Sequence, residues 1–117
     1  MVSAPAYTCP VDVPLHILGG KWKLLLVYRL LDGARRNGEL KRLVGGISQK
    51  VLTQQVRELV RDGLVVRTVE SRVPLKVVYE IDRRERAALE SLLDELCKWG
   101  VEWAGRAGAI IGTVPVG

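Results

Sequence analysis

Residues 48–61 constrain the fold of this chain more than any other segment, because they combine a helix start signal with a two-faced pattern. Ser48 is a preferred N-cap residue, and Ile47 before it is spaced to pack on Leu52. The apolar positions recur at helical spacing and are Leu52, Val56, Leu59 and Val60. The opposite face is polar and consists of Lys50, Thr53, Gln54, Arg57 and Arg61. We therefore expect a helix with one face in a core and one cationic, amide-bearing face outside.

Shorter helices are expected before this segment. Cys9-Pro10 predicts a helix over residues 9–18, because proline is favoured at the first helical position. Residues 21–31 (KWKLLLVYRLL) are apolar on nearly all sides, which indicates a helix buried between others. Asn37 or Gly38 is expected to cap a short helix over residues 39–44, which a glycine pair then ends.

Gly63 is expected to end the helix over residues 48–61, and a β-hairpin follows it. Strands are predicted over residues 64–69 and 77–81, with a basic turn over residues 72–76 between them. Asp82 with Glu85 three residues later is a variant of the capping box. This pair predicts a last helix over about residues 83–104.

The positive charge is concentrated in the middle of the chain. Residues 21–76 carry thirteen Lys and Arg against five Asp and Glu, whereas the whole chain has a formal net charge of +5. Such a block suits a polyanion, since phosphates neutralised by Lys and Arg release bound counterions. A solvated basic face explains the charge alone equally well.

Several classes of protein are not supported by the sequence. No run approaches the roughly 20 apolar residues of a membrane-spanning helix, so we expect a cytoplasmic protein without membrane contact. Cys9 and Cys97 share no CxxC spacing, and His16 lacks a second ligand at helical spacing, so no metal site is predicted. No motif for a cofactor or for catalysis is present, and we expect neither a cofactor nor an enzyme.

The order of these elements predicts an α+β, mainly α, winged helix-turn-helix domain that spans residues 1–117. Its helix-turn-helix covers about residues 37–62 and its wing about residues 64–81. We expect Gln49, Lys50, Thr53 and Gln54 to read base edges of double-stranded DNA, and Lys41 and Arg57 to hold phosphates. The full set of expected DNA contacts is Arg36, Lys41, Ser48, Gln49, Lys50, Thr53, Gln54, Arg57, Arg72 and Lys76.

The last predicted helix suggests a homodimer. A helix of about 20 residues is roughly 30 Å long, so part of its apolar face extends beyond the core of a small domain. The residues expected at the dimer interface are Leu89, Leu92, Leu93, Leu96, Trp99 and Trp103. Cys97, next to this face, is expected to be buried as a small apolar residue.

Several segments of the chain resemble one family of regulators. They are CPVDVPLHILGGKWKLLLVYRLLDG, GELKRL, GISQKVLTQQVRELVRDGLVVRTV, VPLKVVYEI and LDELCKWG. These segments are similar to the HxlR-type winged helix-turn-helix regulators, relatives of the MarR group. The resemblance implies a homodimer that binds pseudo-palindromic promoter DNA through the helix over residues 48–61. It also implies that Cys9 matches a cysteine with which several members sense electrophiles or oxidants.

Two questions stay open at this point. Cys9 is either an inert cysteine or a sensor: a helix N-terminus would favour its thiolate, whereas Asp12 opposes it. The fold is either a DNA reader or a winged helix that serves as a protein-interaction module. A thiol redox enzyme that uses Cys9 is a further alternative, although no CxxC motif or partner histidine supports it.

Overall fold

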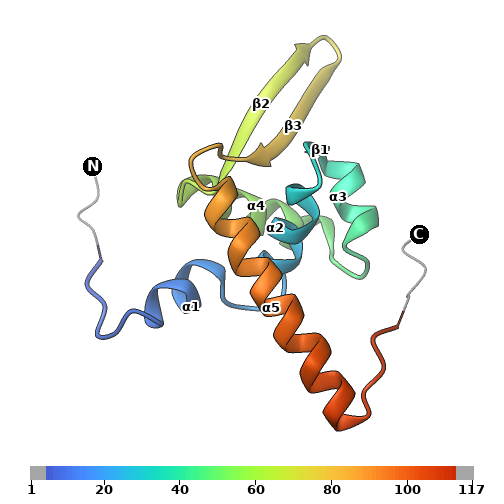
Figure 1. Ribbon diagram of the computed structural model, residues 1–117. Helices are drawn as coiled ribbons and strands as arrows, with labels where there is room; N and C mark the ends of the chain where they lie inside the picture. The colour runs from blue at the N-terminus through green and yellow to red at the C-terminus, as the bar shows by residue number, and fades with distance from the viewer. Residues whose placement is uncertain (1–4, 113–117) are drawn as a thin grey trace.

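The computed structural model describes residues 5–112 and confirms a mixed fold dominated by helices (Figure 1). In chain order, the elements are α1 (Asp12–Leu18), α2 (Lys23–Leu31), β1 (Arg35–Arg36), α3 (Asn37–Leu43), α4 (Gln49–Arg61), β2 (Val65–Arg72), β3 (Leu75–Ile81) and α5 (Arg86–Ala107). The pair α3 and α4 forms the helix-turn-helix, and β2 with β3 forms the wing, which projects from the body of the molecule (Figure 1).

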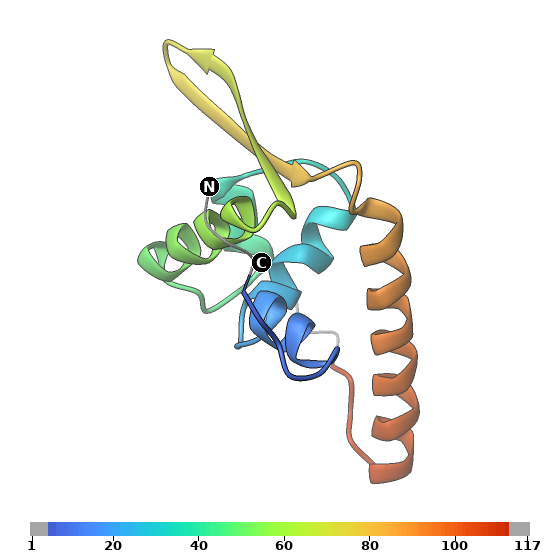
Figure 2. The ribbon, with the colours of Figure 1, turned by 90° about the vertical axis from the view of Figure 1, so that its left-hand side faces the viewer.

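Helix α2 lies at the centre of the core. Leu26, Val27 and Leu30 have no exposed surface, and the helix contacts α3, α4, α5 and β3. Figure 2 shows α2 between α4 on one side and α5 on the other. The sequence predicted burial on nearly all sides, but Leu25 and Tyr28 are 46% and 43% exposed. One face of α2 is therefore uncovered in the single chain.

Helix α3 begins at Asn37, two residues before the predicted start at residue 39. Arg36, not Asn37 or Gly38, is the N-cap of α3, and its backbone N–H donates to Oε1 of Glu39 at 2.9 Å. The predicted break after α3 is confirmed, with Gly46 at φ +88° between the two helices. This left-handed conformation favours glycine, which has no Cβ to clash.

The wing belongs to a three-stranded antiparallel sheet with the order β1-β3-β2. The two-residue strand β1 was not expected, and it pairs Arg35 with Tyr79. Both wing strands are longer than predicted, so the turn is reduced to Val73 and Pro74. The predicted placement of Arg72 and Lys76 in a loop is therefore wrong, because both lie in strands.

The starts of the first and last helices also differ from the sequence analysis. Helix α1 begins at Asp12, and Cys9 precedes it, with its carbonyl oxygen accepting the N–H of Asp12 at 3.0 Å. Helix α5 begins at Arg86, because the Asp82 carboxylate accepts the N–H of Arg84 at 2.8 Å and forms a turn instead of a cap. At its other end α5 stops at Gly108, with φ +69°.

The C-terminal part of helix α5 projects beyond the rest of the body (Figure 1). Its buried residues are Leu89, Leu93 and Ala104. Among residues 5–112, no helix combines the length and the apolar composition needed to cross a membrane.

The central position of α2 generates a prediction about stability. Leu30→Ala removes a side chain with no exposed surface and should lower the free energy of unfolding by about 2–5 kcal/mol, because the cavity that remains collapses incompletely. Urea unfolding followed by circular dichroism measures this loss. Val73→Ala is the control: this residue is 91% exposed, and a change above about 0.5 kcal/mol is not expected there. Equal effects of the two substitutions would contradict the assignment of α2 as the core helix.

Candidate nucleic-acid interface

The N-terminus of α4 is anchored as the sequence predicts. Ser48 is the N-cap, and its Oγ accepts a hydrogen bond from the backbone N–H of Val51 at 3.1 Å. Ile47 before the cap is buried with Leu52 in the same core cluster. These contacts hold the first turn of α4 in place, so the side chains that follow it have a defined direction.

One face of α4 is exposed and polar, as predicted. Leu52, Val56 and Leu59 are buried on the inner side. The outer side carries the exposed residues Gln49, Lys50, Thr53, Gln54 and Arg57. Within this face, Nε2 of Gln49 donates to Oγ1 of Thr53 at 3.0 Å. Lys50, Gln54 and Arg57 are exposed beside this pair, so their cationic and amide groups are accessible to a ligand.

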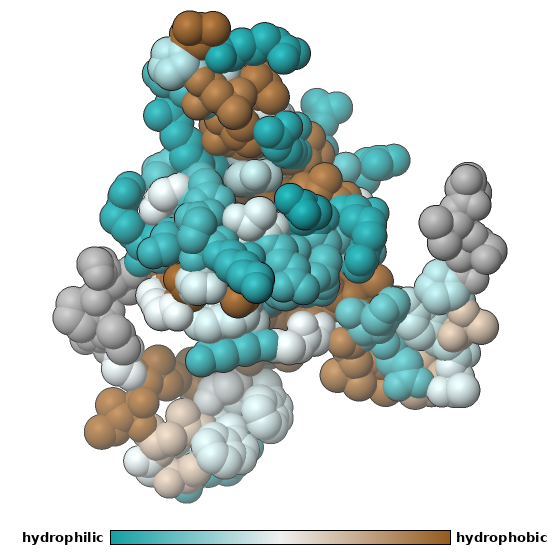
Figure 3. Space-filling view, turned by 180° about the vertical axis from the view of Figure 1, so that it is seen from behind, coloured by the Kyte–Doolittle hydropathy of each residue, from teal (hydrophilic) through white to brown (hydrophobic). Residues whose placement is uncertain are grey.

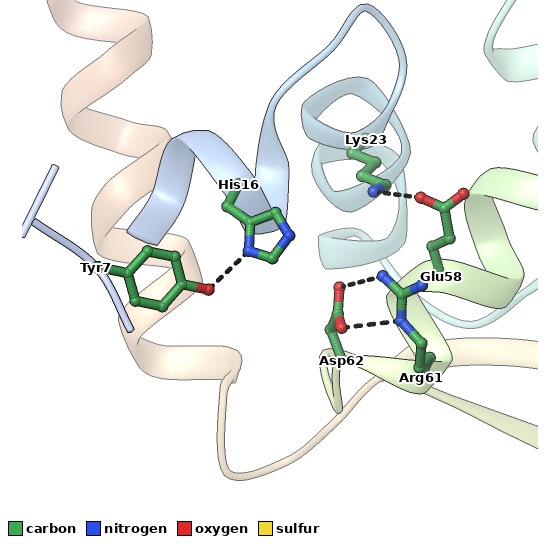
Figure 4. A network of polar contacts seen from close by, with 6 residues as sticks. All are labelled: Tyr7, His16, Lys23, Glu58, Arg61 and Asp62. Atoms are coloured by element: carbon green, nitrogen blue, oxygen red, sulfur yellow. Dashed lines mark hydrogen bonds and ion pairs between the residues drawn. The ribbon is translucent and has the colours of Figure 1, made fainter. Parts of the chain in front are cut away.

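A partly buried ion pair connects α4 to α2 and was not predicted from the sequence. Nζ of Lys23, the first residue of α2, lies 2.8 Å from Oε1 of Glu58 on α4, and the two side chains are 8% and 25% exposed (Figure 4). The hydrogen bond from Lys23 lowers the pKa of Glu58 below its ordinary value of 4.5. The two partners are 35 positions apart, and no local pattern marks them as neighbours.

The acidic groups close to this face are paired with other residues. Glu58 pairs with Lys23, and Asp62 lies 3.2 Å from Nε of Arg61 (Figure 4). Among the residues that the structure describes, neither Lys50 nor Arg57 takes part in an ion pair. Their charges therefore contribute an uncompensated positive potential on the outer side of α4.

A cleft separates the exposed face of α4 from the base of the wing. Its volume is about 240 Å³, and its lining residues are Thr53, Val56, Arg57, Val60, Arg67 and Tyr79. Arg67 was missed in the sequence analysis, although it lies in a predicted strand and is opposite Tyr79 in the sheet. Arg57 and Arg67 reach this cleft from different elements, so an anion there would meet two guanidinium groups.

The remaining expected DNA contacts lie on β1, α3 and the wing. Arg36 is partly engaged, because its guanidinium lies 3.5 Å from Glu70 on β2, while Lys41 is exposed on α3. Arg36 also lines a polar depression of about 580 Å³ with Gly38, Glu39 and Arg42. At the far end of the wing, Arg72 and Lys76 are exposed.

The architecture and this cationic face can now be compared with known proteins. A family model described as HxlR-like helix-turn-helix matches residues 17–107. The chain belongs to the HxlR family. The HTH-type transcriptional regulator YtcD of Bacillus subtilis is 46% identical over 100 residues, which cover 86% of this chain and 79% of YtcD.

Solved structures of similar sequence have the same fold. The crystal structure of the regulator YtcD superposes with a TM-score of 0.76 at 43% identity and covers 84% of this chain and 99% of that one. The structure of the redox regulator HypR in its reduced form superposes with a TM-score of 0.75 at 39% identity. The match covers 80% of this chain and 92% of the HypR chain. These similarities confirm the predicted family and the winged helix-turn-helix class of transcriptional regulator.

The two cysteines of this HxlR-family chain are both exposed, and neither occupies its predicted environment. Cys9 precedes α1 instead of lying at its first turn. Cys97 was expected to be buried, but it lies at the edge of an apolar cleft of about 310 Å³ between α2 and α5, lined by Leu24, Leu25, Tyr28, Leu93, Leu96 and Cys97. The residues of α5 that join the core cluster, Leu89 and Leu93, both precede Cys97, and this cysteine is left in contact with solvent.

The residues expected at a dimer interface fall into two groups. Leu89 and Leu93 are 5% and 7% exposed, because they pack into the core of their own chain, which corrects their assignment as free interface residues. The other four are exposed by 37 to 60% and are Leu92, Leu96, Trp99 and Trp103. This apolar surface is continuous with the uncovered face of α2 at Leu25 and Tyr28 through the cleft.

His16 is engaged by a neighbouring side chain and not by a metal-ligand cluster. Its Nδ1 lies 2.6 Å from the hydroxyl of Tyr7 (Figure 4). Between residues 5 and 112, no three His, Cys, Asp or Glu side chains are grouped so that they could hold a metal ion.

The Lys23–Glu58 pair generates a prediction about pH. The lowered pKa of Glu58 means that its stabilising contribution is complete above its ordinary value of 4.5 and is lost as the pH falls through the lower folded value. Glu58→Gln should therefore lower the free energy of unfolding at pH 7, and its difference from the wild type should shrink below pH 4.5. Urea unfolding at a series of pH values provides the measurement.

The matched control for this prediction is Glu95→Gln. Glu95 lies 3.4 Å from Lys98, but the two side chains are 76% and 70% exposed, so this substitution should change stability little at any pH. A difference between Glu58→Gln and the wild type that stays constant from pH 7 to pH 3 would show that the effect does not come from the carboxylate charge.

Proposed function

We propose that this HxlR-family chain acts as a homodimer that reads a pseudo-palindromic DNA operator, with α4 as the recognition helix. The observation that carries the proposal is the outer face of α4, whose five polar residues are exposed while the nearby acids are paired elsewhere. Charged side chains are sufficient to keep a protein surface soluble. Solubility does not require amides and hydroxyls beside unpaired cations. This combination suits a surface that presents both phosphates and base edges.

The dimensions and chemistry of α4 suit the major groove of DNA. The groove is about 12 Å wide and admits one α-helix, and 13 residues span roughly 20 Å. Glutamine can bond adenine with two hydrogen bonds, and lysine can donate to the acceptors of guanine. In this arrangement Gln49, Lys50, Thr53 and Gln54 face base edges.

The phosphate contacts come from residues around α4. Arg57 and Arg67 line one cleft, so the sugar-phosphate strand that borders the groove would pass between α4 and the wing. Lys41 is exposed on α3, Arg36 precedes α3 next to Glu70 of the wing, and Arg72 with Lys76 extends the contact along the wing. Ser48 caps the helix by accepting the N–H of Val51, and a phosphate at this end would meet the remaining N-terminal N–H groups.

The exposed apolar surface supports a second copy of the chain as the partner. Trp99 and Trp103 are 60% and 49% exposed, which is unusual for tryptophan in a free surface and typical of interface anchors. Two copies joined through α5 would present two α4 helices to half-sites about one helical turn apart, on the same side of the duplex. Such a regulator would act in the cytoplasm, because its DNA target lies there.

A response to oxidants through Cys9 is part of the proposal. Cys9 is exposed in the segment before α1, and the similar protein HypR is a redox regulator with reduced and oxidised structures. Oxidation of this thiol would alter the segment that leads into α1, next to two exposed apolar residues, Val11 before the helix and Leu15 within it.

The DNA-binding proposal predicts two different kinds of variant. After in vitro selection of a duplex from a random pool, Lys50→Ala should weaken binding to the selected duplex more than to random DNA, by about 1–3 kcal/mol of discrimination. Arg67→Ala should weaken binding to both equally. It should also reduce the slope of log affinity against log salt by about 2 per dimer, since each half loses one phosphate contact.

Fluorescence anisotropy at several salt concentrations, with excess random competitor, measures these effects. The selected sequences should contain two related half-sites in inverted orientation. Selection that recovers no common sequence, or binding that the competitor abolishes, would contradict the proposal. That result would favour a winged helix that binds another protein.

The redox proposal predicts that diamide changes the DNA affinity of the wild type but not that of Cys9→Ser. The physical reason is that diamide oxidises accessible thiols, and a serine hydroxyl does not react in this way. Cys97→Ser, the second exposed cysteine, shows whether the response needs both thiols. An equal response of the wild type and Cys9→Ser in the anisotropy assay would overturn the role of Cys9.

A further inference from the structure

The tip of the wing is apolar and almost completely exposed. Val73 is 91% exposed and Leu75 is 64% exposed, and Pro74 between them is exposed as well. The space-filling view shows apolar side chains gathered at the end of the hairpin, beyond the polar surface of the body (Figure 3). These residues contribute nothing to the core, so their apolar character needs another explanation.

Cations lie on both strands beside this tip. Arg72 is directly opposite Leu75 in the sheet, and Lys76 is opposite Ser71. Within residues 5–112, neither Arg72 nor Lys76 forms an ion pair, and Glu70 on the same wing lies within 3.5 Å of Arg36. The tip of the wing is therefore apolar, and the unpaired positive charges of Arg72 and Lys76 lie directly beside it.

The wing is placed so that its tip can reach DNA bound to α4. The cleft at its base is shared by Arg57 of α4 and Arg67 of β2. From Arg67 to Val73 the strand advances by six residues, or roughly 20 Å at about 3.3 Å per residue. That length is enough to cross one sugar-phosphate strand and reach the adjacent minor groove, which is about 6 Å wide.

We propose that Val73, Pro74 and Leu75 form a wedge that enters this minor groove, opens a base step and bends the duplex. Leucine and proline are among the side chains that proteins insert between base steps, which bends DNA away from the inserted side by about 20–90°. Arg72 and Lys76 would contact the phosphates that flank the groove and hold the wedge in place. The proposal rests on the proposed function, because it requires a duplex on α4.

Charge complementarity is the reason for assigning DNA to this tip. An apolar protein surface would match the tip alone, and an acidic protein surface would match only the cations behind it. A minor groove offers both, since phosphates border it and its floor and walls are the edges of bases and the sugars. A protein partner at the tip is the competing outcome of the test.

The test uses Val73→Ser combined with Leu75→Ser, which removes the apolar surface and keeps Arg72 and Lys76. The full-length protein is titrated into the selected duplex, which carries donor and acceptor dyes at its ends and 2-aminopurine at the steps flanking each half-site. We expect the wild type to bend the duplex by about 20° or more and to raise 2-aminopurine emission. The double variant should lose about tenfold in affinity together with the bend and the emission change.

Two controls separate the wedge from other effects. Ile110→Ser removes a residue that is 92% exposed beyond α5, and it should bind and bend DNA like the wild type. Arg72→Ala should lower the salt dependence of affinity, whereas the double serine variant should keep the wild-type salt dependence. Thermal unfolding should be unchanged in the double serine variant, since neither residue is part of the core.

Base analogues then locate the contact. Replacing G·C by I·C at the flanking steps removes the guanine amino group from the minor groove and leaves the major-groove edge unchanged. The wild type should bind the I·C duplex more tightly than the G·C duplex, and the double serine variant should bind the two equally.

The outcomes distinguish this inference from the proposed function. Selective binding to a straight duplex, or equal bending by the wild type and the double variant, would overturn the wedge and leave the DNA-reading role of α4 intact. Equal preference of both proteins for I·C would also overturn it. Failure of the wild type to select any sequence would refute the proposed function and the wedge together.

Discussion

The burial of α2 is the constraint on which the rest of the structure depends. Leu26, Val27 and Leu30 have no exposed surface, and α3, α4, α5 and β3 all contact this helix. Because close-packed cores do not deform continuously, the position of α4 relative to the wing follows from how each packs on α2. The Lys23–Glu58 pair adds a polar connection between α2 and α4 at the edge of the same core.

The chemistry of the outer face depends on where the acids are. Glu58 is directed toward α2, and Asp62 and Glu70 pair with arginines next to them or across the sheet. Lys50 and Arg57 on α4 consequently have no acidic partner among residues 5–112, whereas Arg61 pairs with Asp62. A basic overall charge alone would not produce this arrangement, since the same composition could pair Lys50 and Arg57 with those acids. The result is a directed positive potential, which also accelerates association with a polyanion.

The sequence analysis was accurate where the signal is local. The Ser48 cap, the apolar stripe of α4 and the glycine at its end each depend on contacts within a few residues, and all three are present. Errors arose where two local signals compete. Asp82 can cap a helix or form a turn, and its bond to the N–H of Arg84 selects the turn, so α5 starts later than expected. Cys97 was misplaced because the helical period cannot show how far a long helix extends beyond the core.

By itself, the sequence determined which segments are helical or extended, which side of α4 is apolar, and the family to which the chain belongs. The helical and extended segments and the apolar side of α4 follow from side-chain spacing along one element, whereas the family follows from the similarity of whole sequence segments to its members. The tertiary structure alone decided which distant residues meet: Lys23 with Glu58, Arg57 with Arg67 at one cleft, and β1 with β3. It also decided which of the apolar residues of α5 remain exposed. Such pairings depend on the packing of whole elements against each other, and the spacing of residues within one element carries no record of that packing.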